Sequence, residues 1–442
     1  MVKNDGILNK ELFELNGKPS FKEAFPQAMQ HVLAMLVGNI TPPILIAQLL
    51  GLPETDKILL MQAAMLIGGI TTLLQLYPVF GFGMGLPNVM GVAFAYMPIL
   101  TAIGLSYGIS GIFGAQLVGA FASIFIGMLM GKIRKYFPPI VSGTVVLSIG
   151  LSLYGTAITY MVGGSGAGDK FGSPIYWLIA LVVLAVTLFC NLFGKGYIKV
   201  SGMLIGIGAG YVISLFVGNM INFSNVQSAS WVALPHLFKW GITFHPSAII
   251  SMILMYIVQA VQTIGDVSST TIGAFNREST DAELGGAIKG QGICGMLGAA
   301  MGGLPTDPYS QNVGLIVTTK VVAKKVFVIV GAIMLLAGLS PKFGALMTTI
   351  PYPVLGGATV TVFAAITMSG IQLITEQPLN YRNKMIVGIS LALGVGVSTV
   401  ANSLQFFPVE VQNIIGKSPI VLAFLVSFIL NIVVPEDNSE AN

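Results

Sequence analysis

Gln311 and Asn312 are adjacent amides inside a short polar stretch, residues 302–325, that lies between longer apolar runs. Pro305 and Pro308 interrupt the same stretch, so it cannot form one continuous helix. An amide side chain offers one acceptor and two donors, which match the alternating carbonyl and N–H groups on a lactam edge. We therefore predict that Gln311 contacts such a ligand. We predict that Asn312 braces the interrupted backbone, whose freed polar groups need partners.

A second polar group lies on the apolar run at residues 246–272. Its five members follow one another at offsets that place them on one face of a helix: Gln259, Gln262, Asp266, Ser269 and Thr270. A carboxylate in an apolar environment is costly, so Asp266 is the first candidate for coupling to a proton or another cation. The alternative is a structural aspartate that accepts hydrogen bonds from freed backbone amides.

Four further side chains lie near interrupted segments or inside an apolar run. Tyr96 and Tyr309 have flat apolar faces, and stacking of a base on an aromatic ring is worth roughly 1–3 kcal/mol; packing is the alternative role for each. His31 has an imidazole that titrates near neutrality and can move a proton, or it is a structural histidine with satisfied hydrogen bonds. Asp307 is a further coupling candidate, with helix capping near a membrane end as the alternative.

The composition defines where these groups must operate. The chain is 54% hydrophobic and 9% charged, with a mean hydropathy of +0.85, whereas a soluble domain has roughly 25% charged residues. It is therefore predicted to be an integral membrane protein in contact with lipid, without a cleavable signal peptide. Cys190 and Cys294 both lie in apolar runs and indicate neither a disulfide nor a metal site.

Apolar segments of membrane-spanning length recur along the chain, and we expect an all-α polytopic protein with about fourteen spans. The expected spans are 25–48, 58–77, 86–105, 109–130, 137–156, 174–193, 198–219, 246–272, 284–301, 304–321, 325–346, 350–370, 384–402 and 418–434. This gives a cytoplasmic N-terminal segment 1–24, a first seven-span repeat 25–219, an extracytoplasmic connection 220–245, a second repeat 246–434 and a cytoplasmic tail 435–442.

The distribution of basic residues predicts the orientation. With the N-terminus inside, sixteen of the 21 Lys and Arg residues fall on the cytoplasmic side and five on the other. Short cytoplasmic loops collect basic residues, so both termini are expected to be cytoplasmic, in the cytoplasmic (inner) membrane. The net charge of +4 then reflects topology and does not indicate nucleic-acid binding.

A weak internal repeat indicates how the spans are arranged. Gly85-Leu86-Pro87 recurs as Gly303-Leu304-Pro305, and residues 139–143 recur as 353–357. Because each half has an odd number of expected spans, the two halves must be inverted relative to each other. Spans three and ten then correspond, and both are expected to be discontinuous, with short extended pieces that line a site.

Residues 310–320, SQNVGLIVTTK, are similar to the motif of the nucleobase-ascorbate transporter family, in which Gln, Glu or Pro precedes Asn-x-Gly and a later Thr-Lys pair. Gln30-His31, Phe94-Ala95-Tyr96 and Thr263-Ile264-Gly265-Asp266 extend the resemblance over the whole chain. The resemblance implies core and gate domains, a homodimer, and nucleobase symport by an elevator-like motion without a cofactor. A Gln-Asn opening resembles the members for xanthine and uric acid, whereas Glu-Asn resembles those for uracil and Pro-Asn those for ascorbate.

The predicted site combines this resemblance with the residue chemistry. We predict substrate contacts at Gln311, Gln262, Tyr96, Ala95, Tyr309 and Ser310. We predict coupling or site-organising roles for Asp266, Asn312, His31, Gln291 and Thr319.

Two residues depart from the family pattern. The family has glutamate in the motif Glu-Thr-x-Gly-Asp where this chain has Gln262, and often aspartate where this chain has Gln291. An amide can donate as well as accept, so the preferred edge of the base can differ. Uracil, hypoxanthine or guanine as substrate, and sodium coupling or uniport, therefore stay open beside proton symport.

Three other functional classes fit the sequence less well. An anion transporter of the same general fold would favour a basic site, and the expected spans contain no arginine. A channel would need a ring of carbonyls or charges from several subunits. An enzyme would need a nucleophile and base, metal ligands or a phosphate-binding loop, none of which is recognisable here.

Overall fold

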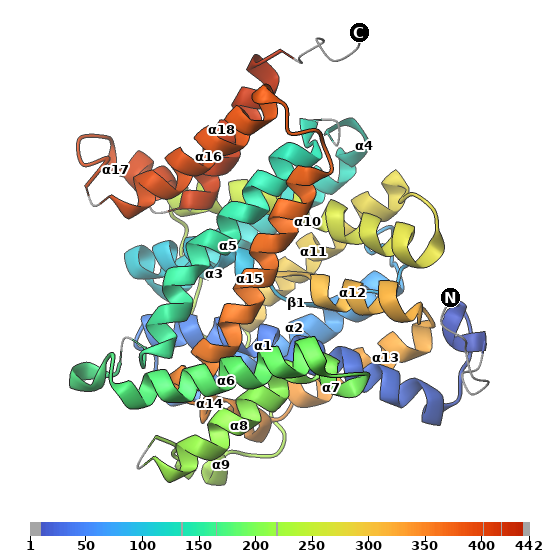
Figure 1. Ribbon diagram of the computed structural model, residues 1–442, viewed down its shortest axis with the longest axis vertical. Coiled ribbons are helices and arrows are strands. Elements are labelled where there is room, and N and C mark those ends of the chain that lie inside the picture. The colour runs from blue at the N-terminus through green and yellow to red at the C-terminus, as the bar shows by residue number, and fades with distance from the viewer. Residues whose placement is uncertain are drawn as a thin grey trace.

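The structure, a computed structural model, describes residues 10–133, 136–164, 166–217, 220–400, 402–416 and 418–435. Residues 1–9 of the predicted N-terminal segment and 436–442 of the predicted tail lie outside the described residues. Within the described ranges the chain is helical apart from two three-residue strands, β1 and β2, near the middle of the bundle (Figure 1).

Seven elements of the described chain are long and apolar enough to cross a membrane. They are α1 (Phe21–Leu49), α2 (Glu54–Leu76), η2 with α3 (Phe94–Tyr96, Met97–Met128), α5 (Pro139–Met161), α6 (Pro174–Phe193), α10 (Pro246–Phe275) and α15 (Tyr352–Thr375). An eighth is the pair α13 (Lys324–Gly338) and α14 (Pro341–Thr348), whose axes differ by 82°.

The other elements are shorter or less apolar. The longer ones are α8 (Gly202–Phe216), α11 (Asp281–Met301), α12 (Ser310–Thr319), α16 (Tyr381–Thr399) and α18 (Pro419–Val433). Short turns of helix are η1 (Lys10–Phe13), α4 (Met130–Ile133), η4 (Gly168–Lys170), α7 (Tyr197–Val200), α9 (Ser224–Ser228), α17 (Val409–Val411) and η5 (Gln412–Gly416).

The predicted boundary between spans at 86–105 and 109–130 coincides with an interruption of α3. The backbone of Gly108 is not helical there, with φ +71° and ψ −175°, and α3 consists of two helical segments joined by a kink at this residue. Only glycine adopts such a backbone without strain, so this residue lets two helical segments meet at an angle. The predicted span at 304–321 is not one helix either, because β2 (Thr306–Pro308) precedes α12.

The helices pack as two groups. The first group, called here the site group, contains α1, α2, α3, α10, α11, α12 and α13. The second, called here the α5–α15 group, contains α5, α6, α8, α15, α16 and α18. Helices α5 and α15 lie side by side along their lengths (Figure 1), and Tyr154 Oη donates to Thr367 Oγ1 at 2.7 Å between them.

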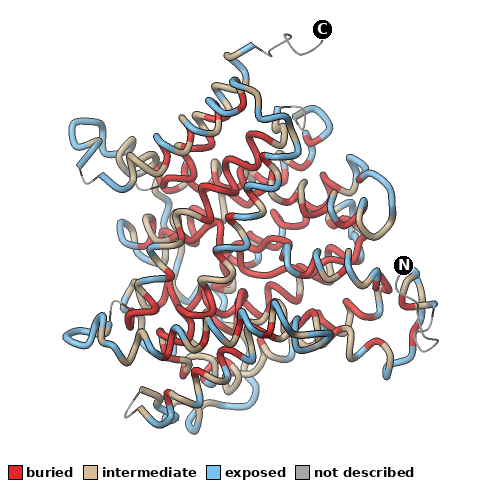
Figure 2. The backbone as a smooth tube through the Cα atoms, viewed as in Figure 1, coloured by how far each residue is buried: buried red, intermediate tan, exposed pale blue. Residues whose placement is uncertain are grey.

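The two strands join segments that are far apart in the sequence. β1 (Met90–Val92) pairs antiparallel with β2, with Gly91 opposite Asp307. β1 leads into η2 and α3, and β2 leads into α12. These are the two places where the sequence predicts extended pieces, and both strands are buried at the centre of the bundle (Figure 2).

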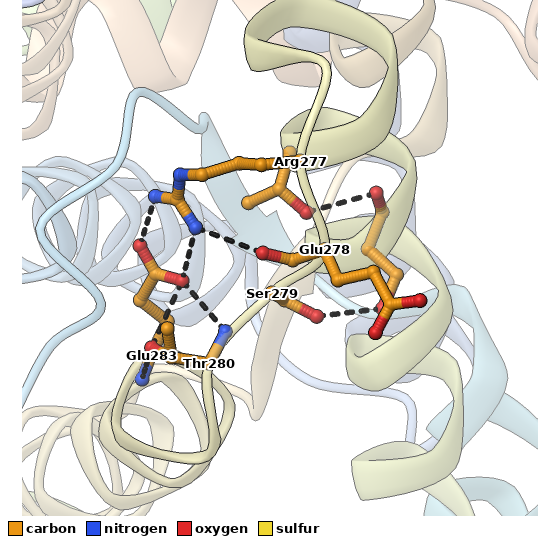
Figure 3. A network of polar contacts seen from close by, with 7 residues as sticks. Arg277, Glu278, Ser279, Thr280 and Glu283 are labelled. Atoms are coloured by element: carbon orange, nitrogen blue, oxygen red, sulfur yellow. Dashed lines mark hydrogen bonds and ion pairs between the residues drawn. The ribbon is translucent and has the colours of Figure 1, made fainter.

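Loops tie the site group together at both ends. The segment 220–245 is fixed to α2 where Trp240 Nε1 donates to Asp56 Oδ2 at 2.8 Å. At the other end, Arg277 pairs with Glu283 across the turn between α10 and α11 (Figure 3). Burial acts to raise the pKa of Glu283, but hydrogen bonds from Arg277 and Thr280 outweigh it and hold the pKa below its ordinary value.

Candidate functional site

The backbone of β1 is held by polar side chains from α1 and α2. Asn39 Oδ1 accepts from the Val92 amide at 2.8 Å, and Thr72 Oγ1 accepts from the Met90 amide at 3.0 Å. Both side chains are fully buried. A break inside a membrane needs such partners for its backbone groups. The sequence prediction missed these residues, although a polar side chain inside each of the first two apolar runs was a usable signal.

Tyr309 links the end of β2 to β1 through two hydrogen bonds. Its hydroxyl donates to the Val92 carbonyl at 3.0 Å, and its amide donates to the Val89 carbonyl at 3.0 Å. Its ring lies on Gly91, where an added Cβ would be 2.3 Å from the ring. The side chain is buried, so the predicted stacking face is covered by protein in this conformation.

Tyr96 and Ala95, the other two predicted contacts beside a break, are also buried. Tyr96 is 0% exposed and packs edge to face against Tyr256, with ring centroids 5.2 Å apart. Ala95 is 3% exposed. In this conformation both side chains are therefore covered by protein.

Asp307 is placed differently from the capping position near a membrane end that the sequence analysis considered. It is the central residue of β2 and is buried. Its Oδ2 accepts from Gln259 Nε2 at 2.9 Å and from Gln262 Nε2 at 3.3 Å. Because β2 crosses the middle of α10, the carboxylate meets the polar face of that helix and caps no helix end.

Asp266 lies on α10 one turn after Gln262, on the polar face that also carries Gln259. Its Oδ1 accepts from Ser310 Oγ, the first residue of α12, at 2.8 Å. Its Oδ2 has no hydrogen-bond partner among the described residues, although the side chain is buried. Asp266 and Ser310 therefore form a direct contact between α10 and α12.

Polar side chains that are open to a ligand lie where α10 faces the start of α12. Ser310 and Gln311 are exposed and Gln262 is half-buried. Gly265 on α10 and Gly314 on α12 both face open space, since a Cβ added at either would meet no atom within 4 Å. Gln311 makes no side-chain hydrogen bond within the described part of the chain. We call Gln262, Ser310 and Gln311 the open polar face.

Asn312 and His31 form a buried contact behind α12. Asn312 Nδ2 lies 2.9 Å from the His31 carbonyl, to which it donates, and 3.2 Å from His31 Nδ1. The imidazole packs against Phe327, with ring centroids 4.8 Å apart. Both polar residues are buried, and their contact fixes α12 to α1.

Gln291 and Thr319 lie apart from the open polar face. Gln291 is buried and exchanges hydrogen bonds with Thr263, at 2.9 and 3.1 Å. Thr319 Oγ1 donates to the Leu315 carbonyl at 2.7 Å at the end of α12. Gln291 thus bonds to the neighbouring helix and Thr319 to its own helix, and the organising role of each stays a prediction.

The site is acidic, and no basic side chain of the described residues lies within ion-pairing distance of its two carboxylates. The three ion pairs found among the described residues involve neither Asp266 nor Asp307. No cluster of three or more His, Cys, Asp or Glu side chains occurs in the described ranges. The site is therefore defined by two buried carboxylates, a set of amides and hydroxyls, and one open edge.

The fold is that of a class of membrane transport proteins. A solved structure of the transmembrane domain of a cyanobacterium bicarbonate transporter, BicA, aligns with a TM-score of 0.61 at 15% identity, covering 95% of this chain and 100% of that chain. Murine Solute Carrier 26 family member A9, an anion transporter in the inward-facing state, aligns with a TM-score of 0.61 at 10% identity over 97% of this chain and 70% of that chain. At these identities the likeness shows the fold alone.

Sequence comparison gives the family. Residues 22–403 match the family described as Permease family, Xan_ur_permease. The xanthine permease of Bacillus subtilis is 34% identical over 415 residues, 93% of this chain and 94% of that protein. The uric acid permease PucK of the same organism is 35% identical over 374 residues, 84% and 86% of the two chains. Xanthine permease XanQ of Escherichia coli K12 is 30% identical over 445 residues, 98% and 95% of the two chains.

The chain belongs to this permease family, the nucleobase-ascorbate transporters, as the motif at residues 310–320 predicted.

Proposed function

We propose that this protein imports a nucleobase, an oxidised purine such as xanthine or uric acid, across the cytoplasmic membrane. The observation that carries the proposal is the open polar face, where Gln262 and Gln311 are accessible at the junction of α10 with a broken span. Two amides supply both acceptors and donors to a lactam edge. Relatives named xanthine and uric acid permeases support the same substrate class.

The acidic interior supports coupling to a cation. Two buried carboxylates without a basic partner among the described residues are costly unless a proton or a metal cation neutralises them. Asp266 contacts Ser310 at the base of the open polar face, so occupancy of the substrate site and neutralisation of Asp266 affect the same contact. Proton and sodium are both suitable ions, and symport of either with the base is the proposed cycle.

The packing supports a two-domain transport mechanism. In this proposal the site group is the core domain and the α5–α15 group is the gate domain, within a fourteen-span, seven-plus-seven inverted repeat. The core carries the substrate past the gate in an elevator-like motion, with both termini in the cytoplasm and two chains in a homodimer. Each half contributes one interrupted span, β1 with α3 and β2 with α12, as expected for a site at a repeat interface.

Replacement of Gln311 by alanine tests the proposed substrate contact. Gln311→Ala is expected to abolish saturable uptake of radiolabelled xanthine and urate in cells, because the donor and acceptor that read the base are removed. Thr318→Ala is the control, since Thr318 is exposed on the same helix, about two turns further on, and its hydroxyl donates only to the Gly314 carbonyl. Equal amounts of both variants in the membrane, with unchanged uptake by Gln311→Ala, would remove Gln311 from the site.

A further inference from the structure

We propose that Asp307 is a specificity-determining positioning residue, which orients the amide of Gln262 so that its oxygen is presented to the substrate as an acceptor. This inference rests on the proposed function and deepens it, because it assigns a polarity to one wall of the substrate site. The juxtaposition that carries it is a buried carboxylate on β2 facing two glutamines of α10.

The hydrogen bonds to Asp307 determine which way each amide points. An amide has a donor end and an acceptor end, and the partner group decides which end faces it. Gln259 Nε2 and Gln262 Nε2 both converge on Asp307 Oδ2, at 2.9 and 3.3 Å. The carboxylate oxygen accepts, so the NH2 group of Gln262 faces Asp307.

Gln259 and Gln262 differ in how far their side chains are exposed. Gln259 is 1% exposed, and its Oε1 is buried without a partner among the described residues. Gln262 is half-buried and lies about one turn from Gly265, which faces open space. Only Gln262 therefore transmits the orientation imposed by Asp307 to a ligand. In this proposal its Oε1 is the acceptor that Gln262 contributes to the open polar face.

An oriented acceptor has a chemical consequence for the ligand. It favours a base that offers an N–H group at that point, and it disfavours a base whose ring nitrogen there carries a methyl group or a lone pair. A site whose polar group is left unpaired rejects such an analogue strongly. Oxidised purines carry several ring N–H groups next to carbonyls, so this wall selects them by their N–H groups while Gln311 reads a lactam edge.

Exchange of the carboxylate at residue 307 with the amide at residue 262 tests the proposal. Asp307→Asn replaces a carboxylate with an amide that has a donor end as well as an acceptor end. The orientation of Gln262 is then no longer fixed, and we expect a loss of affinity for xanthine or urate of roughly tenfold. We also expect the preference for xanthine over one of its N-methyl derivatives to become smaller. In the double variant Asp307→Asn with Gln262→Glu, the new glutamate accepts both from the new asparagine and from the base. Affinity and discrimination should return toward those of the wild type.

A matched control separates orientation from charge. Asp307→Asn with Gln259→Glu restores the same net charge beside β2, but at a buried residue, so it should not recover discrimination. Competition of wild-type uptake by 1-, 3-, 7- and 9-methylxanthine gives the reference. Equal recovery by both double variants, no recovery by either, or unchanged discrimination in Asp307→Asn would overturn the proposal. Absence of nucleobase uptake by the wild type would instead refute the proposed function itself.

A second variant covers the case in which Asp307→Asn fails to insert. Gln262→Met keeps a similar volume and removes the acceptor from the open polar face while Asp307 stays in place. It should lose discrimination against the same methylxanthine as Asp307→Asn would, and retain its rank order for the others. Unchanged discrimination by Gln262→Met would show that no acceptor at this position reads the base.

Discussion

Asp266 and Asp307 place two carboxylates in a buried region where no basic side chain of the described chain pairs with them. Asp266 is the one in contact with α12, through Ser310. Its second oxygen has no partner in the described structure. A buried carboxylate with a free acceptor is suited to take up a proton or to contact a cation. At the scale of single residues, this is the group we expect to couple ion and substrate.

Asp266→Asn should uncouple transport. The amide cannot carry the ionic charge, so accumulation of substrate against its gradient is expected to disappear, while exchange of labelled for unlabelled base continues. Uptake into vesicles with and without an imposed cation gradient measures both. Asp169→Asn is the control, because Asp169 is exposed in a loop, in η4. Full accumulation by Asp266→Asn would exclude the residue from coupling.

The sequence predicted part of this chemistry and missed another part. Gln311 and Asn312 follow from a motif of adjacent residues, and the stripe on α10 follows from helical spacing. The contact of Asp307 with Gln262 spans 45 positions along the chain, and only the pairing of β2 with β1 brings the carboxylate to α10. The burial of Tyr309 has the same origin, since its ring needs Gly91 of the other strand.

At the scale of elements, the two short strands form the part of the fold that positions the site. Their backbone groups are satisfied by each other and by Asn39 and Thr72. Tyr309, between β2 and α12, joins the two strands and covers Gly91. The strand pair therefore lies where α10 and α12 meet and contacts α10 through Asp307.

Gly91→Ala should destabilise the pairing of β1 with β2. A Cβ at residue 91 would lie 2.3 Å from the Tyr309 ring, and relief of that overlap is expected to cost about 1–3 kcal/mol. Gly155→Ala is the control, because a Cβ there meets nothing within 4 Å on α5 and alanine favours a helix. Thermal unfolding of the detergent-solubilised protein, with uptake in parallel, compares the two. A Gly91→Ala protein as stable as the control would contradict the packing described here.

The sequence predicts the breaks better than the helix boundaries. Pro305 and Pro308 mark the interruption before α12, because proline removes a backbone donor and is unfavourable inside a helix. Proline alone does not decide this, since α1 continues through Pro42 and Pro43. The junction predicted near Gly108 is also an interruption, since the backbone of Gly108 is not helical and separates two segments of α3. The predicted span 86–105, by contrast, begins at residue 86, whereas the helix begins only at Met97, after β1 and η2. Hydropathy cannot separate these elements because the buried strand is as apolar as the helix that follows it.

At the scale of the whole molecule, two groups of helices pack against each other and the strands lie within the site group. Among the described residues, seven or eight elements are long and apolar enough to cross a membrane. The expected number of about fourteen is larger because it also counts shorter or more polar helices such as α8, α11, α12, α16 and α18. Helices α8 and α18 are apolar but have only 15 residues each. In the more polar helices, the surrounding protein can cover the polar groups.

Labelling of introduced cysteines tests the proposed orientation. Both native cysteines are buried, which gives a low background. Lys170→Cys, in an exposed turn, should react with a membrane-impermeant maleimide added to intact cells. Lys132→Cys, in the exposed turn after α3, should react only after the membrane is opened. The reverse pattern would invert the proposed topology.

The most direct test of the account is uptake by the purified protein in liposomes. Radiolabelled xanthine, urate, hypoxanthine, guanine and uracil would each be supplied with a proton gradient, a sodium gradient or no gradient. We predict accumulation of xanthine or urate above equilibrium with one of the two gradients, and its loss when that gradient is dissipated. Uptake that only equilibrates under every gradient would contradict coupling. A preference for uracil over the oxidised purines would contradict the proposed substrate.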